Sequence, residues 1–373
     1  MYGLYIHIPF CVSQCNYCNF YRIAPIKQSN VNRFLSALAQ ELKNLPTNFA
    51  PTTIFIGGGT PTALPDPQLK QLLQTLQNTI DLSNITEFSC EANPGTLTPK
   101  KCTLLRTAGI NRISMGIQTF NPTALKMLGR IHTPLEAKNA FQQLRSTGFK
   151  QISLDLLQSL PCTTLKQTLD DCQQAIELNP EHISSYNLIY EPGTKLTTQR
   201  NQGILQEIDE DDEANRYFAV KNIFEKAGYE HYEISNFSKP TYASRHNQLY
   251  WNGEEYLGCG PAAHSHWNGK RFGNIENLDT YCTRLETGQK PYQEKEHLPP
   301  KQKARETLIM QLRMLKGVHL KHFKHQTGYT PKQLAPTAIN ELLEQKLLLQ
   351  NNTHLRINPN ALFISNTIFS ALI

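Results

Sequence analysis

Short apolar runs, many of them β-branched, alternate with longer amphipathic stretches over the first half of the chain. The short runs predict strands at residues 4–8, 53–56, 87–91, 112–117, 152–156 and 183–188. The stretches between them predict helices, among them 31–42, with apolar residues at helical spacing on one face, and 164–178. Parallel strands need such crossovers, so we expect six βα units.

Six βα units predict an α/β fold, an incomplete (β/α)6 relative of the eight-unit TIM barrel. In that architecture the chemistry gathers in the loops that follow the C-terminal ends of the strands. Five sets of candidate residues fall there: Cys11–Cys18, Gly57–Thr60, Glu91–Pro94 and Gln118 follow the first four strands, and Asp155 lies near the end of the fifth. We therefore expect them to meet at one rim of the barrel.

The chain changes character after Pro192-Gly193. An acidic run at 209–213 leads into an amphipathic helix, and the Gly-, Asn- and aromatic-rich stretch 228–273 predicts loops. Residues from 286 onward are rich in Lys and Leu, with a helix near 300–315, a second at 342–349 and a hairpin that includes 355–357. The predicted domains are a barrel at 1–195, a connecting region at 196–285 that completes the core, and a small α+β, winged-helix-like domain at 286–373.

Composition indicates a soluble globular protein. Of the 373 residues, 39% are hydrophobic, which is enough for buried cores. The chain has no run of eighteen apolar residues and opens on a strand without a secretory leader. Nine cysteines, an odd number, fit a reducing compartment better than a disulfide framework. We expect a cytoplasmic protein, with peripheral contact at the inner face of the membrane as an option.

The basic surplus lies in the C-terminal part of the chain. The net charge is +6, and in residues 286–373 Lys and Arg outnumber Asp and Glu two to one. Such a surface suits nucleic acid, anionic lipid or an acidic partner, or is simply solvated. We do not expect nucleic-acid binding, because the chain carries no combined aromatic and basic RNA-binding signature.

Three cysteines follow the first predicted strand as Cys11-x-x-x-Cys15-x-x-Cys18. A closed zinc site needs four protein ligands, so this set is one ligand short. Thiolates at short spacing also hold iron–sulfur clusters, and three of them would leave one iron open for a substrate or cofactor. The alternatives are a zinc knuckle completed by His7 and three unrelated cysteines.

The triad, the segment Gly57-Gly-Gly-Thr-Pro-Thr62 and the segment Glu91-Ala-Asn-Pro94 together resemble the radical S-adenosylmethionine (SAM) superfamily. Within it the chain looks most like the oxygen-independent coproporphyrinogen oxidase group, and above all its heme-chaperone branch, HemW. The resemblance covers nearly the whole chain. It implies a [4Fe-4S] cluster on Cys11, Cys15 and Cys18, with SAM chelating the open iron.

The resemblance also implies which residues contact SAM. They are Tyr5, Tyr17, Gly58, Gly59, Thr60, Glu91, Gln118, Arg130 and Asp155, with a backbone contact from Ile189. Arg130 is suited to pair with the SAM carboxylate, because a planar guanidinium binds carboxylates bidentately. Several of these residues also have a structural alternative: a tight turn for the glycines, an ion pair for Glu91, Gln118, Arg130 and Asp155, and a core position for Tyr5.

Phe20 distinguishes two branches of the group. The coproporphyrinogen III dehydrogenases carry a fourth cysteine two residues after the triad, where this chain reads Cys18-Asn19-Phe20. The chain also lacks the N-terminal extension of those enzymes. The resemblance therefore favours a heme chaperone, and we assign no catalytic residue. The alternative is an oxygen-independent coproporphyrinogen III oxidase, which oxidatively decarboxylates two propionates in heme biosynthesis.

The segment Arg245–Trp251 resembles the HNxxYW motif of the chaperone branch. His246 is the predicted heme ligand, since imidazole can bind heme iron, and His264 is the second candidate. The alternative is that the motif braces the loop 258–264 against the barrel. A further histidine set at one helical face suits a solvated helix rather than a metal site: His319, His322 and His325.

Two local departures from the family pattern bear on the shape of the substrate pocket. The chain has Ser159-Leu160-Pro161-Cys162 where the family has Gly-Leu-Pro-Gly, and Ala262 where glycine is usual. The expected partners are heme and a membrane hemoprotein of the respiratory chain that receives it. A membrane surface that meets the basic C-terminal domain and a homodimer are further options.

Overall fold

The computed structural model describes residues 1–373, apart from the side chain of Glu294. Its centre is a run of six parallel strands that pair in chain order, which confirms the predicted partial barrel. The strands are β1 (Tyr2–Ile8), β2 (Thr53–Gly58), β3 (Glu87–Ala92), β4 (Arg112–Gln118), β5 (Gln151–Leu157) and β6 (His182–Tyr186). Strand β6 ends two residues before its predicted limit.

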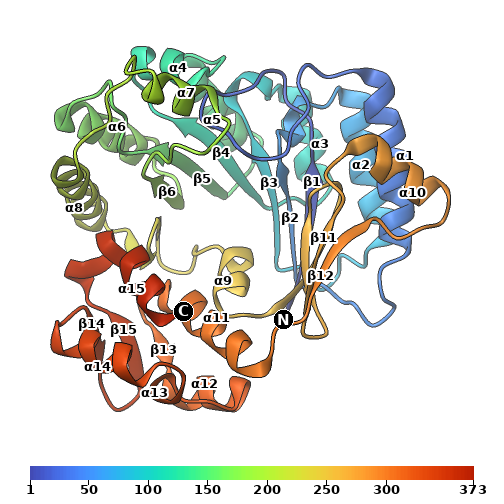
Figure 1. Cartoon of the computed structure of the whole chain (residues 1–373). Helices are drawn as coiled ribbons and strands as arrows, with labels where there is room; N and C mark the ends of the chain where they lie inside the picture. The colour runs from blue at the N-terminus through green and yellow to red at the C-terminus, as the bar shows by residue number, and fades with distance from the viewer.

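Helices cover the outer, convex face of this curved sheet (Figure 1). They are α1 (Gln28–Lys43), α2 (Asp66–Thr79), α3 (Pro99–Thr107), α5 (Pro134–Ser146), α6 (Leu165–Leu178) and α8 (Glu210–Lys226). Helix α1 buries the predicted apolar stripe, including Val31, Phe34 and Leu38. Thr133 and Thr164 begin α5 and α6 with capping boxes, in which a threonine hydroxyl and an acidic or amide side chain satisfy the first free N–H groups.

The sheet is wider than the six predicted strands. Strand β9 (Glu255–Cys259) pairs parallel to β1, followed by antiparallel β10 (His264–Trp267), β11 (Lys270–Asn274) and β12 (Tyr292–Glu296). At the other side β8 (Asn236–Ser238) and β7 (Glu230–Glu233) pair next to β6. The prediction of loops over 228–273 was therefore wrong, because these strands are short and only the distant pairings of β9 with β1 and of β8 with β6 join them to the main sheet.

One of these strand pairs has a local signal. Asn268 and Gly269 join β10 to β11 with φ values of 50° and 73°. An Asn-Gly pair is the usual choice for a two-residue hairpin turn, because both central residues of that turn need positive φ. The dipeptide therefore marks a hairpin inside a stretch that otherwise carries no strand pattern.

The C-terminal part forms a second core (Figure 1). Its elements are α11 (Pro300–Leu312), β13 (Val318–His319), α12 (Leu320–Thr327), α13 (Pro331–Leu334), α14 (Pro336–Glu344), β14 (Leu348–Gln350), β15 (His354–Ile357), η3 (Pro359–Ile364) and α15 (Ser365–Leu372). The antiparallel strands pair in the order β13-β15-β14. The predicted helix at 342–349 instead ends at Glu344, where Lys346, with a φ of 56°, turns the chain into β14.

The two ends of the barrel differ in what they carry. The C-terminal ends of β1–β6 meet the loop 9–27 together with α4 (Pro122–Leu128) and α7 (Lys195–Asn201), at the top of Figure 1. The second core lies below the opposite end of the sheet. Among the described residues, no helix is long and apolar enough to cross a membrane.

Candidate cluster and cofactor site

A cavity of about 660 Å³ opens among the loops at the C-terminal ends of the parallel strands. Its wall includes every residue that the sequence analysis assigned to the cluster or to SAM, together with His246, the first of the two candidate heme ligands. These are Cys11, Cys15, Cys18, Tyr5, Tyr17, Gly58, Gly59, Thr60, Glu91, Gln118, Arg130, Asp155 and His246. The fold thus gathers residues up to 241 positions apart in the sequence; their individual roles remain predictions.

The cysteine loop is held in place by backbone contacts at both ends. The Ile23 N–H donates to the Pro9 carbonyl at 2.6 Å, and the Cys11 N–H donates to the Ile23 carbonyl at 3.1 Å. In the middle of the loop, Asn16 donates through its backbone and side chain to the carbonyls of Leu128 and Met127 at the end of α4. These bonds fix the loop without using the thiols.

The three thiols face the cavity in a polar setting. The Cys11 Sγ lies 3.5 Å from the Thr60 hydroxyl, and the Arg130 guanidinium donates to the Cys15 Sγ at 3.3 Å. Burial raises the pKa of Cys11 and of Cys18, so both are protonated at neutral pH until a metal displaces the proton. Nearby guanidinium charge favours the thiolate form that iron requires.

The donor set fits an iron–sulfur cluster better than a single zinc ion. Among the described residues, no three His, Cys, Asp or Glu side chains converge on a position for one metal ion. The proposed fourth zinc ligand, His7, is also occupied. Its Nδ1 lies 3.0 Å from the Tyr5 hydroxyl and its Nε2 lies 2.9 Å from the Tyr21 carbonyl oxygen. The zinc-knuckle alternative is therefore unsupported.

The glycine run at the end of β2 is required by the protein's own packing. A Cβ on Gly58 would come within 2.5 Å of the His7 ring, and one on Gly59 within 2.7 Å of the Phe10 carbonyl oxygen. Gly58 also has a φ of 103°, which side chains disfavour. Its N–H donates to Glu91 at 3.1 Å. The run therefore brings strand β2 against the Glu91 side chain at the cavity wall.

Two carboxyl groups share the cavity. Burial, followed by the nearby charge of Asp155, raises the pKa of Glu91 to about 8. Burial likewise raises the pKa of Asp155, although the Ser184 and Ser114 hydroxyls oppose the shift; Ser114 donates to it at 3.0 Å. Carboxyl groups in such a site suit a ligand that presents positive charge and hydroxyl donors, as SAM does.

Arg130 is already engaged with the protein. Its Nη2 donates to the Gly116 carbonyl and to the Asn93 side chain, and its Nη1 donates to Cys15. Bidentate pairing with a SAM carboxylate would require some of these contacts to change. The Nε atom is buried with no partner among the described residues. Asn93 also donates to Thr60 at 2.8 Å, so it connects two predicted contacts, a role that its place in Glu91–Pro94 does not reveal.

The remaining predicted contacts, Gln118, Tyr5 and Tyr17, each have a different local setting in the cavity wall. Gln118 ends β4 in the left-handed region, with a φ of 70°. The Tyr5 ring lies against Phe55, with 6.3 Å between the ring centroids. Tyr17 packs against a small apolar cluster that includes Leu128 and Leu160. Burial raises the pKa of both tyrosines, so both stay neutral.

His246 lies in the cavity wall with both ring nitrogens occupied. It is 1% exposed, its Nδ1 lies 2.8 Å from the Thr53 hydroxyl, and its Nε2 lies 2.8 Å from the Tyr250 hydroxyl. Burial lowers its pKa to about 4. Iron could bind only after one of these hydrogen bonds breaks. The geometry therefore favours the structural alternative over ligation of heme iron.

Helix α9 (Arg245–Trp251), which carries His246, depends on a buried carboxylate that sequence reasoning missed. Glu87, at the start of β3, accepts hydrogen bonds from the Ser244 hydroxyl and from the backbone N–H groups of Arg245 and His246, at 2.9 to 3.2 Å. The second histidine candidate, His264, is exposed at the start of β10 and does not line the cavity.

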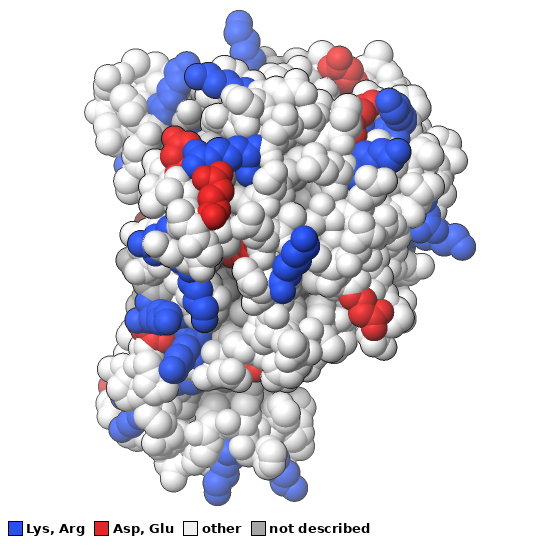
Figure 2. Space-filling model, turned by 90° about the vertical axis from the view of Figure 1, so that its right-hand side faces the viewer, with Lys and Arg blue, Asp and Glu red and all other residues white. Residues whose placement is uncertain are grey.

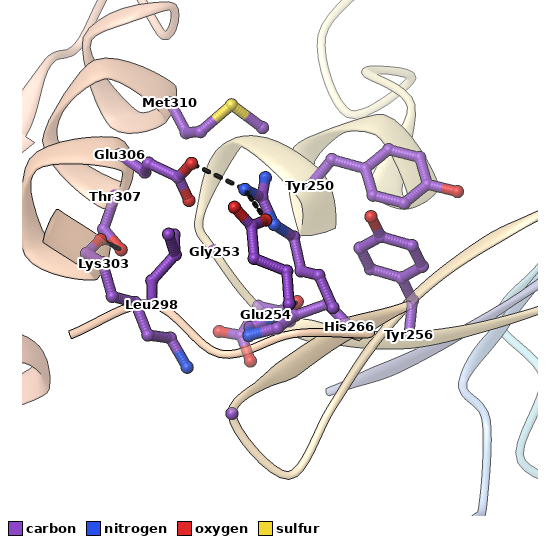
Figure 3. A pocket seen from close by; sticks show the side chains of 13 residues that line it. Tyr250, Gly253, Glu254, Tyr256, His266, Leu298, Lys303, Glu306, Thr307 and Met310 are labelled. Atoms are coloured by element: carbon purple, nitrogen blue, oxygen red, sulfur yellow. Dashed lines mark hydrogen bonds and ion pairs between the residues drawn. The ribbon is translucent and has the colours of Figure 1, made fainter. Parts of the chain in front are cut away.

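A second cavity, of about 80 Å³, lies beneath α9, between the sheet and α11. Figure 3 shows Tyr250 and Tyr256 at one side and Glu306 and Met310 at the other. Arg271 in β11 pairs with Glu296 and Glu306 at 2.7 Å each, which ties the sheet to the C-terminal core. Tyr250 lines both cavities, so α9 is their shared wall.

Comparison with known proteins places these features in a wider group. Residues 5–178 match the radical SAM superfamily, and residues 298–364 match the HemN C-terminal domain. The chain is 35% identical to heme chaperone HemW of Bacillus subtilis, over 100% of this chain and 99% of that protein. It is 39% identical to heme chaperone HemW of Escherichia coli over 272 residues, covering 70% of this chain and 69% of that protein.

A solved structure shows the same fold. Coproporphyrinogen III oxidase (HemN) from Escherichia coli, a radical SAM enzyme, superposes with a TM-score of 0.87. The match covers 100% of this chain and 89% of that one, at 21% sequence identity. At this identity the likeness establishes the arrangement of the barrel and the C-terminal domain, whereas activity has to be argued from the site.

Proposed function

This chain belongs to the HemW family of the radical SAM superfamily, and on that basis we propose that it is a heme chaperone that binds heme and delivers it to hemoproteins. The observation that carries the proposal is the pairing of full-length similarity to heme chaperones with Phe20 at the cavity wall. Phe20 stands where the dehydrogenase branch has a fourth thiol. Radical SAM membership itself implies a [4Fe-4S] cluster and SAM.

We assign the cluster to Cys11, Cys15 and Cys18 and SAM to the adjoining wall. A cluster held by three thiolates has one iron open to SAM and, once reduced, supplies the electron for SAM cleavage. Arg130 donates a hydrogen bond to the Cys15 Sγ and so orients this ligand. Glu91 and Asp155 accept the donors of the bound cofactor. The hydrogen bond from Asn93 to Thr60 fixes the part of the cavity wall that these two residues form.

The proposed acceptor is a membrane hemoprotein of the respiratory chain, reached from the cytoplasm. The support is the charge of the C-terminal domain. Figure 2 shows Lys and Arg side chains with few acidic ones in its lower part, where this domain lies. Exposed side chains there include Lys321, Lys324, Lys332 and Lys346. Such a surface is attracted to anionic lipid headgroups.

The test compares heme binding with enzyme activity in one preparation. The full-length protein is reconstituted anaerobically with iron and sulfide, and its iron content is measured. Hemin titration followed by Soret absorbance should show saturable binding, and heme should pass to an apo b-type cytochrome. Incubation with SAM, a reductant and coproporphyrinogen III should yield no protoporphyrinogen. Decarboxylated product from protein with a full cluster would overturn the proposal in favour of the dehydrogenase alternative.

A further inference from the structure

Two large apolar side chains stand exposed at the mouth of the main cavity. Phe20 is 71% exposed and Ile189 is 66% exposed, and both line the cavity. Tyr186 adds a third exposed apolar side chain, at 40%. Exposed apolar groups that gather at a cavity mouth mark a place where an apolar partner binds.

The two side chains come from loops that meet across the open side of the partial barrel. Phe20 belongs to the loop after β1, and Ile189 follows β6, with four strands of the sheet between them. The Asn19 side chain donates to Glu191 at 3.4 Å, and the Leu196 N–H donates to the Asn16 carbonyl at 2.9 Å. These contacts hold the two loops together at the rim of the cavity that the three thiols also line.

A cation, Arg22, lies next to Phe20. The Arg22 Nη1 donates to the Phe20 carbonyl at 2.8 Å, and Arg22 lines the cavity. Its Nε is buried with no partner among the described residues. A flat apolar surface with a guanidinium at its edge is complementary to a flat apolar ligand that carries carboxylates. A porphyrin with its two propionates has this chemistry.

The interior of the cavity is a poor alternative for the porphyrin. Its volume of about 660 Å³ is in the range that a single cofactor-sized ligand fills. The proposed cluster and SAM would occupy this volume and leave no room for a porphyrin. The one histidine in the cavity wall that the sequence offered as an iron ligand, His246, has both nitrogens bonded. A porphyrin at the mouth avoids both obstacles and keeps one face open to an acceptor.

We propose that heme docks across the mouth of this cavity, with one porphyrin face on Phe20 and Ile189 and a propionate directed to Arg22. The inference rests on the proposed heme-chaperone function and locates its cargo site. Because the contact is made by the porphyrin face and its carboxylates, iron is not required for docking.

The test uses the full-length, cluster-reconstituted protein and Soret titrations with hemin. Phe20→Asp and Ile189→Asp should each weaken binding at least tenfold, because a carboxylate would meet the porphyrin face. Ile204→Asp is the matched control, since Ile204 is 70% exposed and does not line the cavity. It should bind hemin as the unchanged protein does. Iron content is measured for every variant, and Ile189 lies outside the cysteine loop, so that variant tests the site with the cluster intact.

Two further probes separate the contributions. Iron-free protoporphyrin IX should bind within a few-fold of hemin, whereas its dimethyl ester should bind more weakly because it lacks free carboxylates. If the unchanged protein binds no hemin, the proposed function fails. If it binds hemin and Ile189→Asp binds equally well with a full cluster, the docking site at the mouth is wrong and the chaperone function stands.

Discussion

The Nε2 of His246 lies 2.8 Å from the hydroxyl oxygen of Tyr250, one helical turn further along α9. On its other side His246 meets Thr53, and its ring stacks on Phe55 at a centroid distance of 5.3 Å. The histidine therefore links α9 to β2 in the wall of the main cavity. Tyr250 continues the link toward the second cavity, where its ring meets Tyr256 edge-on.

Removing the Tyr250 hydroxyl should destabilise the protein. Tyr250→Phe leaves the buried His246 Nε2 without its partner, which costs roughly 1–2 kcal/mol. Urea unfolding monitored by circular dichroism measures the change. Tyr256→Phe removes the same group from the neighbouring ring, whose hydroxyl makes no hydrogen bond to a described residue, and should change stability by less than about 0.5 kcal/mol. Equal losses in both variants would contradict the assigned hydrogen bond.

His246→Ala should lower stability and leave heme binding in place. The substitution opens a cavity against Phe55 and strips hydrogen bonds from Thr53 and Tyr250, which together cost roughly 3 kcal/mol. A Soret titration below the unfolding temperature should show an unchanged band position and an affinity within threefold. A shifted band or lost binding in a folded variant would make His246 the iron ligand after all.

Replacing any of the three loop cysteines should lower the iron content of the protein, whereas replacing one of the other six should not. Cys11→Ala, Cys15→Ala or Cys18→Ala should each abolish stable cluster assembly, because a cluster with two protein ligands is poorly held. Iron and sulfide analysis after reconstitution provides the measurement. Cys162→Ala is the matched control, since Cys162 is also partly exposed and does not line the cavity. It should retain full iron content, and loss of iron there would question the ligand assignment.

Glu41 should make stability fall as the pH rises toward neutrality. It accepts hydrogen bonds from the Tyr281 hydroxyl, the Gly260 N–H and the Asn274 side chain, yet burial raises its pKa to about 7. The folded state thus holds a proton that the unfolded state, with a pKa near 4.5, has already lost. The free energy of unfolding should decrease from about pH 4.5 to pH 7 and then level off with respect to this group.

Glu41→Gln isolates this contribution. Glu91, with a pKa of about 8, and Asp171, with a pKa of about 6, act in the same direction, whereas His246, with a pKa lowered to about 4, acts in the opposite one, so the unchanged protein shows only the net effect. The difference between the two proteins should change by up to about 3 kcal/mol between pH 4.5 and pH 8. Urea unfolding across this range tests it, and parallel curves for the two proteins would show that Glu41 does not titrate as described.

Ala262→Gly should stabilise the protein slightly. Ala262 has a φ of 61°, a left-handed conformation that costs an alanine roughly 1–2 kcal/mol and a glycine almost nothing. Because glycine gains backbone freedom in the unfolded state, we expect a net gain of about 0.5 kcal/mol in thermal or urea unfolding. Ala263→Gly, at a buried position without positive φ, should instead destabilise. A loss in both variants would show that packing at Ala262 outweighs its backbone strain.

Some features were predictable because they depend on local pattern. The six parallel strands follow from apolar runs that must be buried on both faces, and α1 follows from a single apolar stripe. The meeting of the cysteine triad with Glu91 and Asp155 follows as well, since loops after parallel strands share one edge of the sheet. Strands β7–β11 were not predicted, because they are short and join the main sheet only where β8 pairs with β6 and β9 pairs with β1, far away in the sequence.

The sequence by itself determined which chemical groups follow successive strands, namely three thiols, a glycine run and a carboxyl group. It thereby also determined at which end of the barrel these groups lie. Tertiary structure decided what those groups are free to do. In the folded protein both ring nitrogens of His246 and the guanidinium of Arg130 are occupied by hydrogen bonds. Phe20 and Ile189, in contrast, are exposed to solvent at the cavity mouth. Spacing along a chain places a side chain on an element, whereas its hydrogen-bond partners and its exposure come from residues that only the complete fold brings near.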